Sequence, residues 1–249
     1  MIFPIGDDNS DRTMTPIVNY LLIAINVLVF VFLQGMGNNE KFTYAYSTVP
    51  QEIRTGQDVD KPVVVEIAGQ RGTIDLQPTP GSVYLTLLTS MFMHGGWMHL
   101  FGNMLFLWIF GDNLENLLGH GRYLIFYLLT GLIASLAHVI STFMFDGNPY
   151  IPSLGASGAI SGVLGGYLLL FPKRQVRVIM LRILTTVPAV VAIGLWFVLQ
   201  LVSAFGMINA GPQSGGGVAF MAHVGGFIAG LVLIKIFAIG RGTAGPRTA

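Results

Sequence analysis

Long hydrophobic runs alternate with short polar connections along most of this chain. A bilayer core about 30 Å thick is crossed by roughly 20 apolar residues in a helix, and six runs approach that length. We expect membrane-spanning helices near residues 17–34, 97–113, 122–145, 157–171, 185–207 and 216–239. The hydrophobic pattern therefore predicts an all-α polytopic membrane protein, built as a bundle of six transmembrane helices.

A long polar stretch, from about residue 35 to residue 79, separates the first two of these runs. It contains KPVVVEI and GTIDLQPTP, in which apolar and polar residues alternate around glycine and proline. Such alternation is typical of a β-hairpin. We expect a small loop insertion outside the membrane, within a single membrane domain that covers residues 17–239.

The composition agrees with a membrane protein and narrows the possible chemistry. Hydrophobic residues make up 53% of the chain and charged residues only 10%, whereas a soluble domain carries about 25% charged residues. The net charge of +1 and the lack of a basic run argue against a nucleic-acid partner. The chain has no cysteine, which excludes disulfides, thiolate metal sites and a cysteine nucleophile.

Lysine and arginine gather in the connections on one side of the predicted bundle. These residues are Arg122, Lys173, Arg174, Arg177, Arg182, Arg241 and Arg247. Positive residues in short loops mark the cytoplasmic side, and the opposite connections at 146–156 and 208–215 contain none. We therefore expect the N-terminal segment 1–16 and the tail 240–249 to be cytoplasmic, with the insertion on the outer side.

The fourth run opens with a serine between small residues, in PSLGASGAISGVLGGYLLL. From Ser157 to residue 171 a helix would be about 22 Å long, which is shorter than the hydrocarbon core. If its lower end sits beside Lys173 and Arg174, Ser157 lies below the outer surface, at the floor of a cavity open to that side. Ser157 could cap the helix, or it could be a nucleophile.

Three further polar residues are predicted at the same depth. His223, in FMAHVGGFIAG, lies about 10 Å below the outer surface if the last run starts near residue 216. His99 and Asn103 are four residues apart, so they share one face at the outer end of the second run. Polar side chains at membrane depth are costly and mark functional sites.

Together these residues could carry out acyl transfer. A serine hydroxyl needs a base to become a nucleophile, and His223 is the candidate general base for Ser157. His99, Asn103 and the backbone N–H of Ser157 could stabilise the oxyanion. Each residue alone has a simpler interpretation, since a lone histidine such as His138 often only packs, and His99 with Asn103 could hydrogen-bond between helices.

Glycine spacing explains how the fourth and sixth helices could approach each other. Overlapping small-xxx-small patterns, which allow close helix contact, are formed by Gly158, Gly162 and Gly166 in one run and by Gly226 and Gly230 in the other. Close contact would bring the Ser157 hydroxyl within reach of His223. Gly155 with Gly158 also fits a turn that lets a substrate backbone come near.

The combination resembles the rhomboid family of intramembrane serine proteases. The resemblance rests on GASG at 155–158, AHVGGFIAG at 222–230, the spacing of His94, His99 and Asn103, and the opening of the first run, PIVNYLLIAINVLVF. It implies a Ser157–His223 dyad without a carboxylate member. It also implies an oxyanion site of His99, Asn103 and the Ser157 amide, with His94 holding the outer loop structure.

The resemblance further implies what the protein acts on and where. Family members cleave single-span membrane proteins near the outer membrane face, and their substrates arrive beside the fifth helix. No metal and no cofactor are expected, and the oligomeric state is left open. The small form resembles prokaryotic members, which implies a bacterial or archaeal cell membrane.

One position departs from the family pattern. Members often carry an aromatic residue four positions after the serine, packed against the catalytic histidine, and Ser161 stands there in this chain. The sequence therefore leaves open what supports the ring of His223.

Three other functions compete with the protease interpretation. A catalytically silent rhomboid-like binder of membrane proteins would typically lack the serine or the histidine, and both are present. A transporter would show broken helices in two repeated halves, and the sequence has no such symmetry. A haem-binding bundle would need facing histidines near the middle of the membrane, whereas these lie near one face.

Overall fold

The computed structural model describes residues 2–59, 61–67, 70–180, 183–210 and 220–241, and its long helices correspond to the six predicted runs. They are α1 (Ile17–Leu28) with a π-helical continuation (Val29–Leu33), α5 (Trp97–Leu118), α6 (His120–Met144), α7 (Ser157–Leu170), α8 (Ala189–Ala210) and α9 (Phe220–Phe237). The ends differ from the predicted ones by up to five residues. Residues 216–219, where the last run was expected to start, and 242–249 of the predicted tail lie outside the described residues.

Three of these helices are long and apolar enough to cross a membrane. They are α6, the segment Ala189–Gly206 of α8, and α9, with mean hydropathies of 2.0, 2.1 and 2.0. The apolar segments Ile17–Leu33 and Ser157–Leu170 are shorter, and α5 carries Asp112 and Glu115 in its last turns. Length and composition therefore identify three candidate spans, and the count of six stays a prediction.

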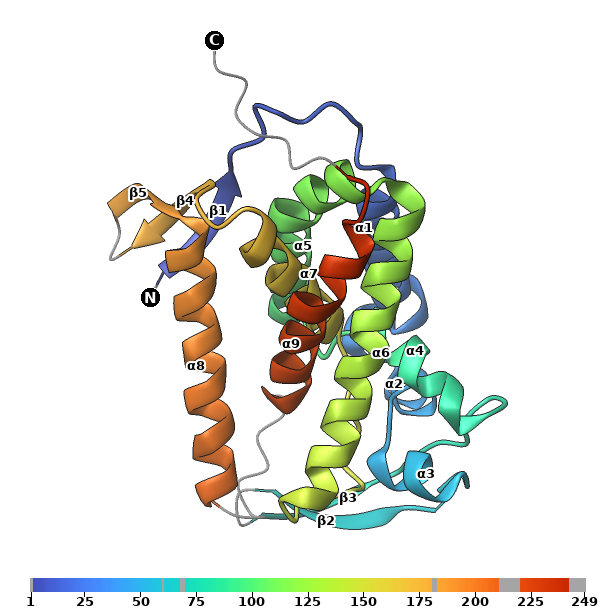
Figure 1. Ribbon diagram of the computed structural model, residues 1–249. Helices are drawn as coiled ribbons and strands as arrows, with labels where there is room; N and C mark the ends of the chain where they lie inside the picture. The colour runs from blue at the N-terminus through green and yellow to red at the C-terminus, as the bar shows by residue number, and fades with distance from the viewer. Residues whose placement is uncertain (1, 60, 68–69, 181–182, 211–219, 242–249) are drawn as a thin grey trace.

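Helix α7 is the centre of the bundle, with α5, α6 and α9 packed around it (Figure 1). Its residues from Gly158 to Tyr167 are all buried. Helix α8 stands at the side of the bundle, next to α9 (Figure 1). A helix this rich in glycine can be surrounded because its surface lets neighbouring backbones come close.

Backbone contact between α7 and α9 is made through the predicted glycines. A Cβ added at Gly226 would overlap the carbonyl oxygen of Gly158, and one added at Gly230 would overlap that of Gly162. Gly158 and Gly162 also face α6, where a Cβ would collide with side chains of that helix. The two helices therefore touch along a seam that excludes even a methyl group.

The chain is mostly helical, as predicted, but its described residues outside the bundle also form two small antiparallel sheets, of which only the hairpin in the insertion was expected. One sheet has the order β1 (Ile2–Asp7), β4 (Gln175–Met180), β5 (Ile183–Pro188). Val176 and Val178 alternate with exposed residues in β4, the period expected of a strand with one buried face. The basic residues of this segment had suggested a plain loop, and residues 185–188, expected in the fifth helix, belong to β5.

The insertion contains the expected hairpin, formed by β2 (Val63–Ile67) and β3 (Gln70–Ile74). It also contains helical segments that its polar composition did not predict: Gly35–Gly37, α2 (Glu40–Ala45) and α3 (Pro50–Thr55). Further turns follow at Val83–Leu85, α4 (Thr86–Thr89) and Ser90–Phe92. The hairpin and the β1–β4–β5 sheet lie at opposite ends of the bundle (Figure 1). This agrees with the prediction that the insertion and the basic connection lie on opposite sides.

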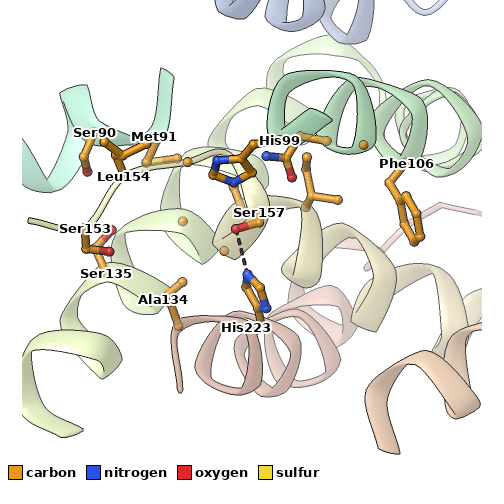
Figure 2. Close-up of a pocket in the computed structure, with 18 of the residues that line it drawn as sticks. Ser90, Met91, His99, Phe106, Ala134, Ser135, Ser153, Leu154, Ser157 and His223 are labelled. Carbon is orange, nitrogen blue, oxygen red and sulfur yellow. Dashed lines mark hydrogen bonds between the residues drawn. The ribbon is translucent and has the colours of Figure 1, made fainter. Parts of the chain in front are cut away.

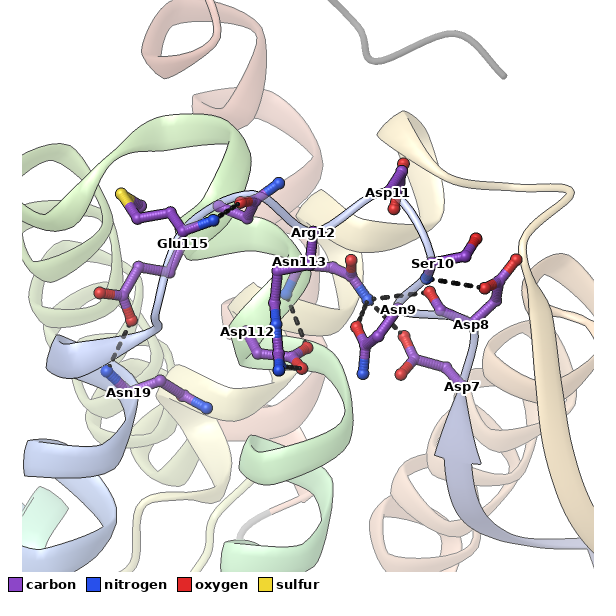
Figure 3. Close-up of polar contacts among 12 residues, drawn as sticks. Asp7, Asp8, Asn9, Ser10, Asp11, Arg12, Asn19, Asp112, Asn113 and Glu115 are labelled. Atoms are coloured by element: carbon purple, nitrogen blue, oxygen red, sulfur yellow. Dashed lines mark hydrogen bonds and ion pairs between the residues drawn. The ribbon is translucent and has the colours of Figure 1, made fainter. Parts of the chain in front are cut away.

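A buried polar network ties the N-terminal segment to the end of the bundle that carries β1 (Figure 3). Asp7, at the end of β1, accepts hydrogen bonds from the Tyr167 hydroxyl at 2.6 Å and from the Asn113 side-chain amide at 2.7 Å. Arg174 also donates to Asn113, at 2.6 Å. These bonds join β1 to α5 and to the C-terminal part of α7.

The side chain of Glu115 caps the N-terminus of α1 at the same end of the bundle. Its two carboxylate oxygens accept the backbone N–H groups of Val18 at 2.9 Å and Asn19 at 2.7 Å. A negative charge at a helix N-terminus satisfies free N–H groups and is favoured by the helix dipole. The Asn19 side chain accepts from Tyr123 and donates to the Leu107 carbonyl, so α1, α5 and α6 are joined here.

The glycine seam predicts a strong difference between two Gly→Ala substitutions. Gly230→Ala would place a methyl group against the backbone of Gly162, and overpacking of this kind costs about 1–3 kcal/mol. Gly194→Ala on α8, where a Cβ has nothing within 4 Å, should be neutral or stabilising. Thermal unfolding in detergent measures both, and equal effects of the two substitutions would contradict the seam.

The raised pKa of Asp7 predicts that the stability of the fold depends on pH. Burial raises the pKa of Asp7 from its ordinary 3.8 to about 7, so its stabilising contribution is full below about pH 4 and is lost as the pH rises through 7. Asp7→Asn keeps an acceptor for Tyr167 without the charge. We expect it to raise the unfolding temperature over wild type at pH 8 and not at pH 4.

The exposed neighbour Asp8 provides the control for this measurement. Hydrogen bonds from Ser10 lower the pKa of Asp8, so Asp8→Asn should give no gain at pH 8. An equal gain from Asp7→Asn at both pH values would show that its charge does not matter.

Candidate active site

Ser157 is the first residue of α7, and an extended loop held by the insertion leads to it. Thr48 and Ser153 exchange two backbone hydrogen bonds, at 3.0 and 2.8 Å, as an isolated β-bridge. The Gly155 N–H donates to the Ser90 carbonyl at 2.9 Å. The insertion thus fixes the approach to Ser157, a role for which the sequence carried no signal.

His223, on α9, faces Ser157 across the glycine seam. Its Nε2 lies 2.7 Å from the Ser157 Oγ (Figure 2), within the range required for proton transfer. The two residues that depth and glycine spacing predicted to meet are therefore in direct hydrogen-bond contact.

Gln200, on α8, holds the other side of the His223 ring. The Gln200 Oε1 lies 2.8 Å from Nδ1 of His223. An amide oxygen only accepts, so Nδ1–H donates to it and Nε2 keeps the lone pair that accepts the Ser157 hydroxyl. The sequence analysis missed Gln200, although it is the single polar residue of GLWFVLQLV.

Ser161 does not take part in supporting His223. Its hydroxyl donates to the Ser157 carbonyl at 2.6 Å, along its own helix. Aromatic neighbours come from other elements instead, since the rings of Trp196 and Phe220 each lie 6.2 Å from that of His223, measured between centroids. The departure noted at Ser161 is therefore compensated from α8 and α9.

His99 presents an N–H on the other side of Ser157. Its Nδ1 accepts the Gly95 N–H at 3.2 Å, so the ring proton is on Nε2. A Cβ built at Gly155 would lie 3.0 Å from this Nε2 and 3.6 Å from the Ser157 Oγ. The positive φ of Gly155, +130°, and the lack of a side chain both suit this narrow position between the two residues.

Asn103 adds a donor that has nothing to bind within the described part of the chain. The residue is only 8% exposed, and its Nδ2 has no hydrogen-bond partner there. The first N–H groups of α7, including that of Ser157, also lack partners inside the helix. An unpaired buried donor is costly, and it is suited to a ligand that carries negative charge.

These groups line one cavity of about 540 Å³. Ser157, His223, His99 and Asn103 border it together with Trp196 of α8, and Figure 2 shows Ser157 between the two histidines. The cavity is formed by α5, α6, α7, α8 and α9, with the loop around Ser153 and Leu154 on one side. It is large enough to receive a short segment of a peptide chain.

His94 lies behind this site rather than in it. It is fully buried, and its backbone N–H and C=O bind the Gln34 side chain at 2.9 and 3.0 Å. Its ring is edge-on to His99, with centroids 5.1 Å apart. His138 of α6 is not among the described residues that line the cavity.

Comparison with known proteins identifies the family. The family model of the rhomboid domain matches residues 81–239. The chain belongs to the rhomboid family. It is therefore an integral membrane protein, and the family includes serine proteases that act within the membrane.

The rhomboid chain is 31% identical over 216 residues to Rhomboid protease GluP of Bacillus subtilis, across 86% of this chain and 34% of that protein. It is 30% identical over 148 residues to Rhomboid protein 1, mitochondrial, of Saccharomyces cerevisiae, across 59% and 40% of the two chains. It is 34% identical over 99 residues to Presenilin-associated rhomboid-like protein, mitochondrial, of Mus musculus, across 40% and 26%. The rhomboid chain thus spans only about a third of the length of these relatives.

The narrow space at Gly155 predicts that a methyl group there disables the site. In Gly155→Ala the new Cβ would press on the His99 ring at 2.8 Å in a strained backbone conformation. We expect reaction of Ser157 with a fluorophosphonate probe to slow roughly 10- to 100-fold through displacement of His99.

Gly95→Ala is the matched control for this prediction. It also adds a methyl group beside His99, but at 3.7 Å from Nδ1, which is ordinary contact. Its labelling rate should stay near that of the wild type. Equal rates for both variants would mean that the position of His99 is not what Gly155 protects.

Proposed function

We propose that this rhomboid chain is an intramembrane serine endopeptidase with a Ser157–His223 dyad. The observation that carries the proposal is the 2.7 Å contact between the Ser157 Oγ and the His223 Nε2, two residues that line one cavity. Serine with an adjacent base is the arrangement that nucleophilic catalysis requires. The resemblance of motifs and the protease named among the relatives agree with it.

The reaction follows from the hydrogen-bond directions. His223 Nε2 takes the Ser157 proton while Oγ attacks the scissile carbonyl carbon, and the same nitrogen then protonates the leaving amine as the C–N bond breaks. A water molecule next gives a proton to Nε2 and attacks the acyl carbon. The bond between that carbon and Oγ then breaks, Nε2 returns the proton to Oγ, and the acid is released. No cofactor or metal is needed for these steps.

The negative charge formed on the carbonyl oxygen would be stabilised by three donors. These are the Nε2–H of His99, the side-chain amide of Asn103 and the backbone N–H of Ser157. The unpaired Nδ2 of Asn103 supports this assignment, because a donor that is already desolvated and unengaged gains most when charge develops. His94, held by Gln34 and packed on His99, would maintain the loop behind these donors.

The proposed setting is a membrane crossed six times, by α1 with its π-helical continuation and by α5 to α9. The N-terminal segment and the basic connection would be cytoplasmic, and the cavity would open toward the side of the insertion. Ser157 at the other end of α7 from Lys173 and Arg174 supports this orientation. Substrates would be single-span membrane proteins cut near the outer face, in a bacterial or archaeal cell membrane.

Covalent labelling tests the function without a known substrate. We expect a fluorophosphonate probe to label the purified wild-type protein in detergent and to lose essentially all labelling in Ser157→Ala and His223→Ala. Both substitutions remove a few polar atoms at the cavity wall, so the unfolding temperature should change little.

Ser153→Ala is the control, since Ser153 lines the same cavity without contacting His223. It should be labelled as the wild type is. A folded wild type that is not labelled would overturn the protease proposal and favour a catalytically silent binder of membrane proteins.

A further inference from the structure

Helix α8 contributes two residues to the surroundings of His223, and they lie one turn apart. Trp196 and Gln200 are four residues apart, so they share one helix face. The Trp196 ring lies beside that of His223, while the Gln200 Oε1 accepts the hydrogen bond from His223 Nδ1. Of the two nitrogens of His223, one therefore faces Ser157 on α7 and the other faces α8.

We propose that Gln200 is a neutral positioning residue for His223 and that it makes the Ser157–His223 pair depend on the packing of α8. The inference rests on the proposed protease function. Gln200 is not among the described residues that line the cavity, and its hydrogen bond is to His223 and not to Ser157, so it would act only through His223.

The need for such a residue follows from the chemistry of imidazole. A neutral imidazole carries its proton on either nitrogen, and only the form with Nδ1–H leaves Nε2 free to accept the Ser157 proton. The Gln200 oxygen selects this form and fixes the ring plane at once. Without it, the ring could present an N–H to the serine, which cannot act as a base.

A neutral amide also suits the surroundings of His223. A carboxylate in this position would stabilise the protonated imidazole more strongly, but it would place a charge inside the bundle, where a charge is costly. Gln200 supplies the acceptor at a lower cost in desolvation.

The way α8 is attached to α9 explains why Gln200 would couple the packing of α8 to the position of the His223 ring. Phe197 stacks on Phe227 of α9, with ring centroids 4.0 Å apart and planes at 17°. The outward face of α8 is more than half exposed, at Val198, Leu199, Val202 and Phe205. An aromatic contact on one side thus fastens α8 to α9, and any loosening of it would draw Gln200 away from His223.

The first experiment measures fluorophosphonate labelling rates from pH 5 to pH 9 for the full chain in detergent. We expect Gln200→Leu to slow labelling roughly 10- to 100-fold with little change in unfolding temperature. Gln200→Glu should restore much of the rate, because a carboxylate also accepts from Nδ1–H. It should also move the low-pH limb of the profile to higher pH, a change that a packing role would not cause.

Leu199→Ala serves as the control, since it shortens a neighbouring side chain on the exposed face of α8. Its rate and pH profile should match those of the wild type.

The second experiment is a double-mutant cycle that tests the link to α8. Phe197→Ala removes the stack on Phe227 and should slow labelling several-fold when Gln200 is present. If α8 acts through Gln200, the same substitution should have little further effect in the Gln200→Leu background. Additive effects of the two substitutions would overturn the link.

The outcomes separate this inference from the proposed function. Wild-type labelling that requires Ser157 and His223, together with an unchanged rate and pH profile in Gln200→Leu, would overturn the role of Gln200 and leave the protease proposal standing. A folded wild type without labelling would overturn both.

Discussion

The direct contact of two helix backbones is the constraint on which the rest of the structure depends. Gly226 and Gly230 of α9 lie against Gly158 and Gly162 of α7 so closely that no Cβ fits between them. Only this approach lets a short serine side chain reach a histidine on the neighbouring helix at 2.7 Å. The same small residues leave little apolar side chain to bury, so the helices are held by close van der Waals contact and by polar anchors at their ends.

These polar contacts lie at the two ends of the bundle, and those at one end are remote from the cavity. At the β1 end, Asp7 and Glu115 bind groups on α7, α5 and α1, and all their partners lie away from the cavity. At the opposite end, Thr48 of the insertion pairs with Ser153 and so orders the loop before Ser157. The polar groups of the first end join the N-terminal segment to the bundle, while near the cavity the Nδ2 of Asn103 has no partner among the described residues.

Much of this arrangement could be predicted from the sequence, because depth in a membrane follows from residue count. The rise of a helix placed Ser157 and His223 at one level, and glycine spacing indicated which helices touch. What was missed depends on contacts that hydrophobicity does not encode. The β4–β5 hairpin looked like a basic loop, and the partner of His223 depended on how α8 is rotated about its axis, which its uniformly apolar sequence around Gln200 does not fix.

The choice of partner for His223 shows how the membrane shapes the site. In soluble serine proteases with a catalytic triad, a buried carboxylate orients the histidine and stabilises the imidazolium that forms. Among the described residues, the neighbours of the His223 ring are a serine, an amide and aromatic rings, and none of these groups carries a charge. Orientation of the ring is therefore achieved by the direction of a hydrogen bond, and in the proposed reaction the charge on the carbonyl oxygen would be stabilised by the donors of His99, Asn103 and the α7 N-terminus.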